Sequence, residues 1–267
     1  MAGRLTGRVA LVSGGAGGQG ASHARVLAEH GAKVVLGDIR DDEGQTLAES
    51  LREQDLDVRA VPLDVRFDDQ WRAAVGFAER TFGHLDVLVN NAGISAAGGV
   101  EDENEDDWHR VIDVNQKGVW LGMRAAIPAL RRAGGGSVIN TASTFGIRPP
   151  ASGIAYAASK GAVQAMTRSA AMAVADADIR VNTLVVSMVD TPFLDRAKRA
   201  GAVERRLREY PLGRIAQPLD VSRAVVFLAS EESSYMTASE MVLDGGMLGG
   251  YTLRLDDQDP RPNPAGA

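Results

Sequence analysis

Tyr156 and Lys160 form a pair whose residue types and spacing could move a proton. They stand four residues apart, which would put both side chains on one face of a helix. A phenol has a pKa of about 10. A neighbouring ammonium favours the phenolate and is expected to lower the pKa of the phenol. Such a pair would be a general acid/base at neutral pH. Alone, however, the pattern is common, and a surface tyrosine beside a solvated lysine would explain it equally well.

A glycine-rich loop lies between an apolar run and a helical pattern near the start of the chain. Gly14, Gly18 and Gly20 follow the run Val9–Ser13. Glycines let the backbone turn tightly and approach an anion, and a helix N-terminus adds free N–H groups and positive charge. Because the loop joins a strand to a helix, it has the context that binding of a dinucleotide pyrophosphate requires.

Asp38 ends the second apolar run, about 20 residues beyond the glycine loop. A carboxylate there can accept hydrogen bonds from the adenosine ribose, and it repels a 2′-phosphate. Capping of the following helix is the alternative use of this acid. Gly17 puts no basic side chain in the loop, and Arg40 is the one nearby residue that could weaken the preference. The sequence therefore predicts NAD rather than NADP.

Three further motifs stand along the chain: Asn90-Asn91-Ala92-Gly93, Val114-Asn115, and Ser143, which precedes Tyr156 by 13 residues. With the glycine loop and the Tyr156–Lys160 pair, their order and spacing resemble the short-chain dehydrogenase/reductase family from about Leu5 to Gly246. The segments Arg8–Ile39 and Ser233–Gly246 look most like bacterial NAD-dependent hydroxysteroid dehydrogenases of the 3α/20β type.

The resemblance implies a catalytic role for four residues. Tyr156 would exchange a proton with the substrate oxygen, and Ser143 would hydrogen-bond that oxygen. Lys160 would lower the tyrosine pKa and hold the nicotinamide ribose. Asn115 would bend its helix and seat a water that links Lys160 to solvent.

The resemblance also implies which residues contact the cofactor and the substrate. The cofactor residues would be Gly14, Gly18, Gln19, Gly20, Asp38, Ile39, Asp64, Val65, Asn91, Ala92, Gly93, Tyr156, Lys160, Val189 and Thr191. The substrate pocket would be lined by Ser95, Ser143, Thr144, Phe145, Ile154, Tyr156, Ser187, Met188, Phe193 and Leu194. Because this lining is mostly apolar and includes no cation, we expect an uncharged substrate that is bulky or cyclic, such as a hydroxysteroid or an aryl or cyclic alcohol.

The chain departs from the family pattern at two turns. Val186-Ser187 replaces the usual Pro-Gly beside the nicotinamide, and this loses a fixed φ and the freedom to adopt a positive φ. Thr237-Ala238 replaces the usual Thr-Gly.

Short apolar runs alternate with longer helical patterns and predict the scaffold. Strands are expected at Val9–Ser13, Lys33–Asp38, Val58–Leu63, Val87–Asn90, Ser137–Ala142, Arg180–Val186 and Glu240–Leu243. The alternation predicts an α/β fold of the Rossmann type, a doubly wound parallel sheet of about seven strands with helices on both faces. Two long helices are expected at Asp106–Arg132 and Ile154–Ala175.

No linker divides the chain, so we expect one dinucleotide-binding and catalytic domain over residues 1–251 and a proline-containing C-terminal tail over 252–267. The charged segment 191–213 is interpreted as a lid, with Phe193 and Leu194 facing inward and its charges facing water. The acidic run Glu101–Asp107 is interpreted as a solvated loop that leads into a helix.

Composition limits the classes of function. The 267 residues include no cysteine, which excludes disulfides, thiolate metal sites and a cysteine nucleophile. The net charge of −6 argues against nucleic-acid binding. No apolar run approaches the roughly 20 residues of a membrane helix, and no signal peptide is evident. We expect a soluble cytoplasmic protein without a metal, and the family resemblance implies a homotetramer.

The leading interpretation is an NAD-dependent enzyme that interconverts a secondary alcohol and a ketone. A 3-oxoacyl-acyl-carrier-protein ketoreductase is the weaker alternative, because such enzymes usually prefer NADPH and a basic docking surface. A non-catalytic NAD(H)-binding sensor is the third, and it has no need of all four residues Asn115, Ser143, Tyr156 and Lys160.

Overall fold

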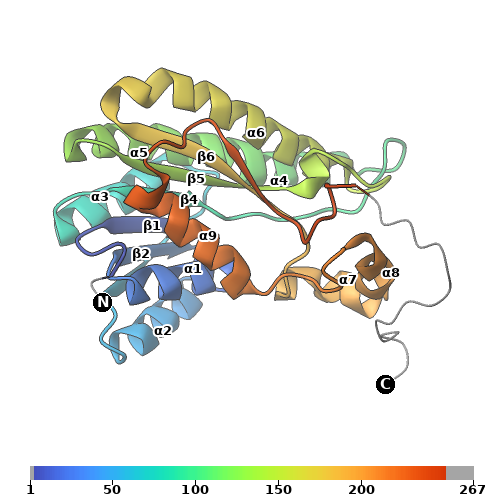
Figure 1. The fold of residues 1–267 in the computed structure, drawn as a ribbon, viewed down its shortest axis with the longest axis horizontal. Coiled ribbons are helices and arrows are strands. Elements are labelled where there is room, and N and C mark those ends of the chain that lie inside the picture. The colour runs from blue at the N-terminus through green and yellow to red at the C-terminus, as the bar shows by residue number, and fades with distance from the viewer. Residues whose placement is uncertain (1–2, 251–267) are drawn as a thin grey trace.

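Seven parallel strands form one sheet in the computed structural model, which describes residues 3–250 (Figure 1). The strands are β1 (Val9–Ser13), β2 (Lys33–Asp38), β3 (Val58–Pro62), β4 (Val87–Asn90), β5 (Gly136–Ser143), β6 (Ile179–Val186) and β7 (Glu240–Leu243). Their order in space is β3-β2-β1-β4-β5-β6-β7, so the winding reverses between β1 and β4. The predicted doubly wound α/β fold is confirmed, and ligands of such sheets bind at the carboxyl ends of the strands near this reversal.

Helices bury both faces of the sheet, which explains why its strands are nearly continuous in apolar residues. One face packs against α1 (Gly18–Glu29), α2 (Asp41–Arg52) and α9 (Pro218–Ala229) (Figure 1). The other face packs against α3 (Asp68–Phe82), α5 (Gly118–Ala133) and α6 (Ile154–Val174). The two apolar cores hold the sheet rigid, and the site residues stand on its edge.

The long helix expected at Asp106–Arg132 is interrupted. The chain forms α4 (Glu105–Ile112), a π-helical turn (Asp113–Lys117) and then α5. Asn115 lies in the π-turn and is fully buried. Its amide oxygen accepts from the Ile94 N–H at 2.8 Å, and its amide nitrogen donates to the Ile94 carbonyl at 2.9 Å. The wider turn thus turns this side chain away from the helix and towards the loop after β4.

Short helices follow β6 and stand beside the layered body, at the right of Figure 1. They are η4 (Pro192–Leu194), α7 (Asp195–Arg199), α8 (Ala202–Arg206) and η5 (Leu207–Glu209). Met188, Val203, Tyr210 and Met247 form a small apolar cluster beneath them, separate from the two main cores. The expected tail, 252–267, lies outside the described residues.

The two turns that depart from the family pattern behave differently. Ser187 is not among the non-glycine residues with positive φ, so the loss of glycine there causes no backbone strain. Ala238 does adopt a positive φ of 56°, a conformation that disfavours residues with a Cβ. Within residues 3–250, none of the helices combines the length and the apolar character that crossing a membrane requires.

Candidate active site

The glycine loop after β1 packs tightly against the first turn of α1. Gly14 and Gly18 have positive φ values of 66° and 53°. A Cβ on Gly20 would lie 1.9 Å from the Gly14 carbonyl oxygen, so only glycine fits there. Asn91 supports the loop, because its amide nitrogen donates to the carbonyls of Ser13 at 3.0 Å and Gly14 at 3.3 Å. These features suit the close approach of a pyrophosphate to the helix N-terminus.

Asp38 lies at the end of β2 beside the same loop and is almost fully buried. Its carboxylate accepts hydrogen bonds from the backbone N–H of Ala16 and of Arg40, each at 3.0 Å. The Arg40 guanidinium lies 3.4 Å from the same carboxylate and pairs with Glu43 at 2.6 Å. A Cβ on Gly17 would lie 2.9 Å from an Arg40 nitrogen, so this cation reaches the glycine loop.

Lys160 is buried on α6, and its Nζ donates to the Thr141 carbonyl at 2.8 Å. Burial lowers the pKa of this lysine to about 8. A Cβ on Gly93 would lie 3.6 Å from Lys160 Nζ and 3.4 Å from Asn115 Oδ1. Asn115 also donates to the Ser159 hydroxyl at 3.2 Å. The structure therefore brings the loop after β4, the π-turn and α6 together around one buried ammonium.

Tyr156 lies one helical turn before Lys160, with the ammonium 5.7 Å from the centre of its ring. Desolvation raises the pKa of this tyrosine, and a hydrogen bond from the Ser143 side chain acts in the opposite direction. We expected a lowered pKa, and for the free protein this is wrong. The removal of the phenol from water outweighs the stabilisation of its anion.

Two phenylalanines flank the Tyr156 ring. Phe145 meets it edge-to-face at a centroid distance of 6.1 Å, and Phe193 lies 6.1 Å from it on a tilted plane. Phe193 is half exposed, whereas Leu194 packs on the small cluster around Met188. The Tyr156 ring is thus bordered by apolar side chains from the layered body and from the short helices, and we refer to this predicted substrate site as the apolar recess.

The remaining cofactor residues predicted from the sequence fall into two groups. Thr191 is buried and its Cβ lies 3.5 Å from a Cβ built on Gly18, so the segment after β6 reaches the glycine loop. Asp64 follows β3 with Val65, and Arg66 binds its carboxylate and holds its pKa below the usual range.

The other predicted positions differ in exposure. Ile39 and Ser95 are exposed, and Thr144 is buried after β5. Gln19 carries a buried side-chain oxygen that has no partner among the described residues. This orphaned acceptor in the glycine loop is consistent with a bound polar ligand.

The sequence did not single out two side chains of the segment 191–213 that the fold turns inward. The Arg206 guanidinium carbon lies 4.9 Å from the centre of the Phe145 ring, although the charges of this segment were expected to face water. The Tyr210 hydroxyl is buried, and its surroundings raise the pKa of that phenol. Neither position carries a motif, and only the folded path of residues 191–213 brings them to the site.

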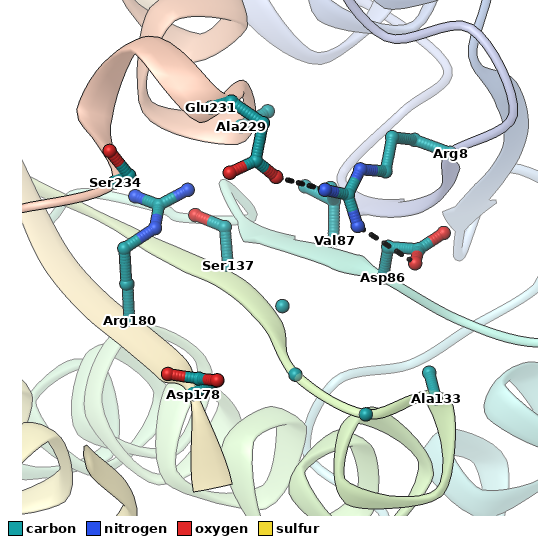
Figure 2. Close-up of a pocket in the computed structure, with 13 residues that line it drawn as sticks. Arg8, Asp86, Val87, Ala133, Ser137, Asp178, Arg180, Ala229, Glu231 and Ser234 are labelled. Atoms are coloured by element: carbon teal, nitrogen blue, oxygen red, sulfur yellow. Dashed lines mark hydrogen bonds and ion pairs between the residues drawn. The ribbon is translucent and has the colours of Figure 1, made fainter.

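A separate cavity of about 310 Å³ lies at the opposite, amino ends of the strands (Figure 2). Arg8 there pairs with Asp86 at 3.3 Å and with Glu231. Arg180 donates to the Ser233 hydroxyl at 2.7 Å and to two backbone carbonyls. Because its arginines already have partners, we interpret this cavity as a structural ion-pair network rather than a second site.

Comparisons with known proteins agree with this geometry. The sequence model of a family described as Enoyl-(Acyl carrier protein) reductase matches residues 14–248. The 3-alpha-(or 20-beta)-hydroxysteroid dehydrogenase of Mycobacterium tuberculosis is 46% identical over 94% of this chain and 93% of that protein. The trans-4-hydroxycyclohexanecarboxylate dehydrogenase of Sinomonas cyclohexanicum is 45% identical over 95% of this chain and 97% of that protein. The crystal structure of gox2181 superposes with a TM-score of 0.89 at 30% identity, covering 92% of this chain and 98% of that one.

Proposed function

The chain belongs to the short-chain dehydrogenase/reductase family, and from this premise we propose that it interconverts a cyclic secondary alcohol and the corresponding ketone with NAD as cofactor. It is an oxidoreductase of the alcohol-dehydrogenase kind, with a nicotinamide cofactor. The cytoplasmic location expected from the sequence stays a prediction.

One observation carries the proposal. Ser143, Tyr156 and Lys160 converge at the carboxyl end of β5, on the same edge of the sheet as the glycine loop. A proton donor, an oxygen-binding hydroxyl and a buried ammonium therefore lie beside a loop shaped for a dinucleotide pyrophosphate. A binding protein without catalysis would gain nothing from burying Lys160, since desolvation of an ammonium is costly.

The residues around Tyr156 account for proton transfer. During alcohol oxidation, the Tyr156 oxygen accepts the hydroxyl proton while the C–H bond of the carbinol carbon breaks and a C=O bond forms. Ser143 donates a hydrogen bond to the substrate oxygen and holds it at Tyr156. A bound nicotinamide supplies the acceptor for the hydride. In ketone reduction, Tyr156 returns the proton to the oxygen.

Asp38 supports the choice of NAD. Its backbone hydrogen bonds fix a buried carboxylate at the end of β2, where it would accept from ribose hydroxyls and repel a 2′-phosphate. Arg40 is the cation that pairs with Asp38, and its ion pairs with Asp38 and Glu43 reduce the charge that it could offer a phosphate.

The apolar recess and the relatives support a cyclic substrate. Phe145 and Phe193 both contact the Tyr156 ring and offer apolar surface to a substrate there. The two relatives from Mycobacterium and Sinomonas are named for a hydroxysteroid and a hydroxycyclohexane acid. Both names describe an alcohol whose carbon skeleton contains a ring.

Tyr156→Phe tests the proposal. Steady-state oxidation of a panel of steroids and cyclic alcohols with NAD identifies a substrate for the wild type, and the variant should then lose on the order of 10²-fold or more in kcat. NADH binding, followed by its fluorescence, should persist because the ring remains. Turnover by the variant at the wild-type rate would contradict the role of the phenol, and the absence of turnover by the wild type with any alcohol would contradict the proposed function.

A further inference from the structure

Resting on the proposed function, we infer that the substrate ring carries a carboxylate remote from the reacting carbon, and that Arg206 binds this group. The inference replaces the uncharged substrate expected from the sequence. It depends on a cation that the fold brings to the apolar recess beside Tyr156.

Arg206 ends α8 and reaches over the site from the short helices. Its guanidinium carbon lies 4.9 Å from the centre of the Phe145 ring, and that ring meets Tyr156 at 6.1 Å. The positive charge is therefore within about 11 Å of the Tyr156 ring, and both groups contact the ring of Phe145. A substrate that spans the recess would meet the proton donor at one end and a cation at the other.

The bonding of Arg206 leaves donors to spare. Its Nε and one Nη donate to Glu209 at 3.2 and 3.3 Å, and that Nη also lies 4.0 Å from Met247 Sδ. The other Nη has no hydrogen-bond partner among residues 3–250. A guanidinium carries five N–H donors in a planar fork, so it can donate hydrogen bonds to a second carboxylate. The side chain is only 24% exposed, so a ligand there would meet it largely shielded from water.

The surroundings of Arg206 are also positive. Residues 195–209 include six arginines and lysines against three acids, in a chain whose net charge is −6. Arg148 donates to the carbonyl of Met247 at 3.5 Å, and the side chain of the same Met247 contacts Arg206. The acid paired with Arg206 is Glu209. A concentration of positive charge at the mouth of an apolar site attracts anionic ligands.

A purely structural role for Arg206 makes a different prediction. If the side chain only held Phe145 and Glu209 in place, its removal would affect charged and uncharged substrates alike. If it binds a carboxylate, its removal would affect the charged substrate selectively. Removal of Glu209 should then favour the charged substrate, because this acid competes for the guanidinium and repels an incoming anion.

The test compares 4-oxocyclohexanecarboxylate with its uncharged methyl ester as substrates for reduction by NADH. We expect the wild type to prefer the acid at least about tenfold in kcat/KM, as for a charge-assisted hydrogen bond. Arg206→Gln should lower the acid-to-ester ratio by about tenfold or more, and Glu209→Gln should raise it or leave it. Arg208→Gln removes the same charge from an exposed neighbour and should change the ratio less than about twofold. An equal ratio in the wild type and Arg206→Gln would overturn the inference.

Calorimetry with cyclohexanecarboxylate, which has no group to oxidise or reduce, separates this inference from the proposed function. The acid should bind the NADH-saturated wild type at least about tenfold more tightly than Arg206→Gln. If the wild type turns over neither these ketones nor any alcohol of the panel, but this difference in binding is found, the proposed activity fails and the carboxylate site stands. If the acid binds both proteins equally, the inference fails whatever the activity.

Discussion

Tyr156 and its hydrogen-bond partner set the expected pH dependence. Desolvation raises the phenol pKa, so Tyr156 is protonated at neutral pH and ready to donate during ketone reduction. Alcohol oxidation needs the deprotonated form. We therefore expect kcat for oxidation to rise with pH as the deprotonated fraction of Tyr156 grows. We expect kcat for reduction to stay level and to fall only above about pH 10.

Ser143→Ala distinguishes Tyr156 from Lys160 as the source of this pH profile. Ser143 lowers the Tyr156 pKa, so its removal should move the residual oxidation profile to higher pH. The pKa of Lys160 is lowered to about 8 by burial alone, without a contribution from Ser143. If the substitution leaves the midpoint of the pH profile unchanged, the titrating group is Lys160 rather than Tyr156.

Asp38 decides between the two forms of the nicotinamide cofactor. We expect the wild type to prefer NAD over NADP by at least about tenfold in kcat/KM, which corresponds to roughly 1.4 kcal/mol. Asp38→Ser should narrow this gap, because the repulsion of a 2′-phosphate is removed and Arg40 loses a partner. Initial rates with NAD and with NADP give the two kcat/KM values. Equal kcat/KM of the wild type with NAD and NADP would show that Asp38 does not select between the cofactors.

The sequence pattern predicts the main strands and helices because both faces of the sheet are buried. The structure has β1, β2 and β4 with the predicted bounds, and β5 and β6 extend by one or two residues beyond them. Buried parallel strands need unbroken apolar runs, and these are visible in any sequence. The pair Tyr156 and Lys160 on α6 is equally easy to find in the sequence, because helix geometry fixes its four-residue spacing.

The π-turn and the position of Arg206 were not predictable in the same way. The family resemblance implies a bend at Asn115, but the apolar pattern alone predicts one continuous helix over Asp106–Arg132 and gives no sign of a π-helical turn. Residues 195–209 carry charges on all sides and do not show which side chain turns inward. Tertiary contacts with Phe145 and Met247 place Arg206, and these contacts are distant in sequence.

The segment 191–213 is proposed to act as a lid over the recess. Its helices α7 and α8 have only five residues each and rest on their own small apolar cluster. Segments with few buried contacts open at low free-energy cost, and closure of a lid excludes water from the reaction. Hydrogen exchange should therefore slow across 191–213 when NADH and a ketone are both bound, while α2 serves as the internal control. Equal protection with and without the ligands would mean that the segment is a fixed scaffold.

Apolar side chains are exposed on the outer surface of α4, α5 and α6. Trp120 is 47% exposed and Met172 67% exposed. A hollow of about 200 Å³ beside Trp120 is lined by Ile112, Gln116, Lys117, Trp120 and Met166. Exposed apolar side chains around a hollow are typical of an interaction surface. The small residues Gly161, Ala162 and Ala165 on α6 would let another helix approach closely.

We propose that this surface pairs with a second copy of the chain, within the homotetramer that the family resemblance predicts. An interface between identical copies is self-complementary, so one substitution changes both sides of the contact. Trp120→Asp should bury two unpaired carboxylates there and convert tetramers into smaller assemblies. Ser50→Asp adds the same charge on α2, across the sheet from this surface, and should leave the assembly unchanged. Light scattering at micromolar concentration measures both variants, and a monomeric wild type, or a Trp120→Asp variant that stays tetrameric, would contradict the proposal.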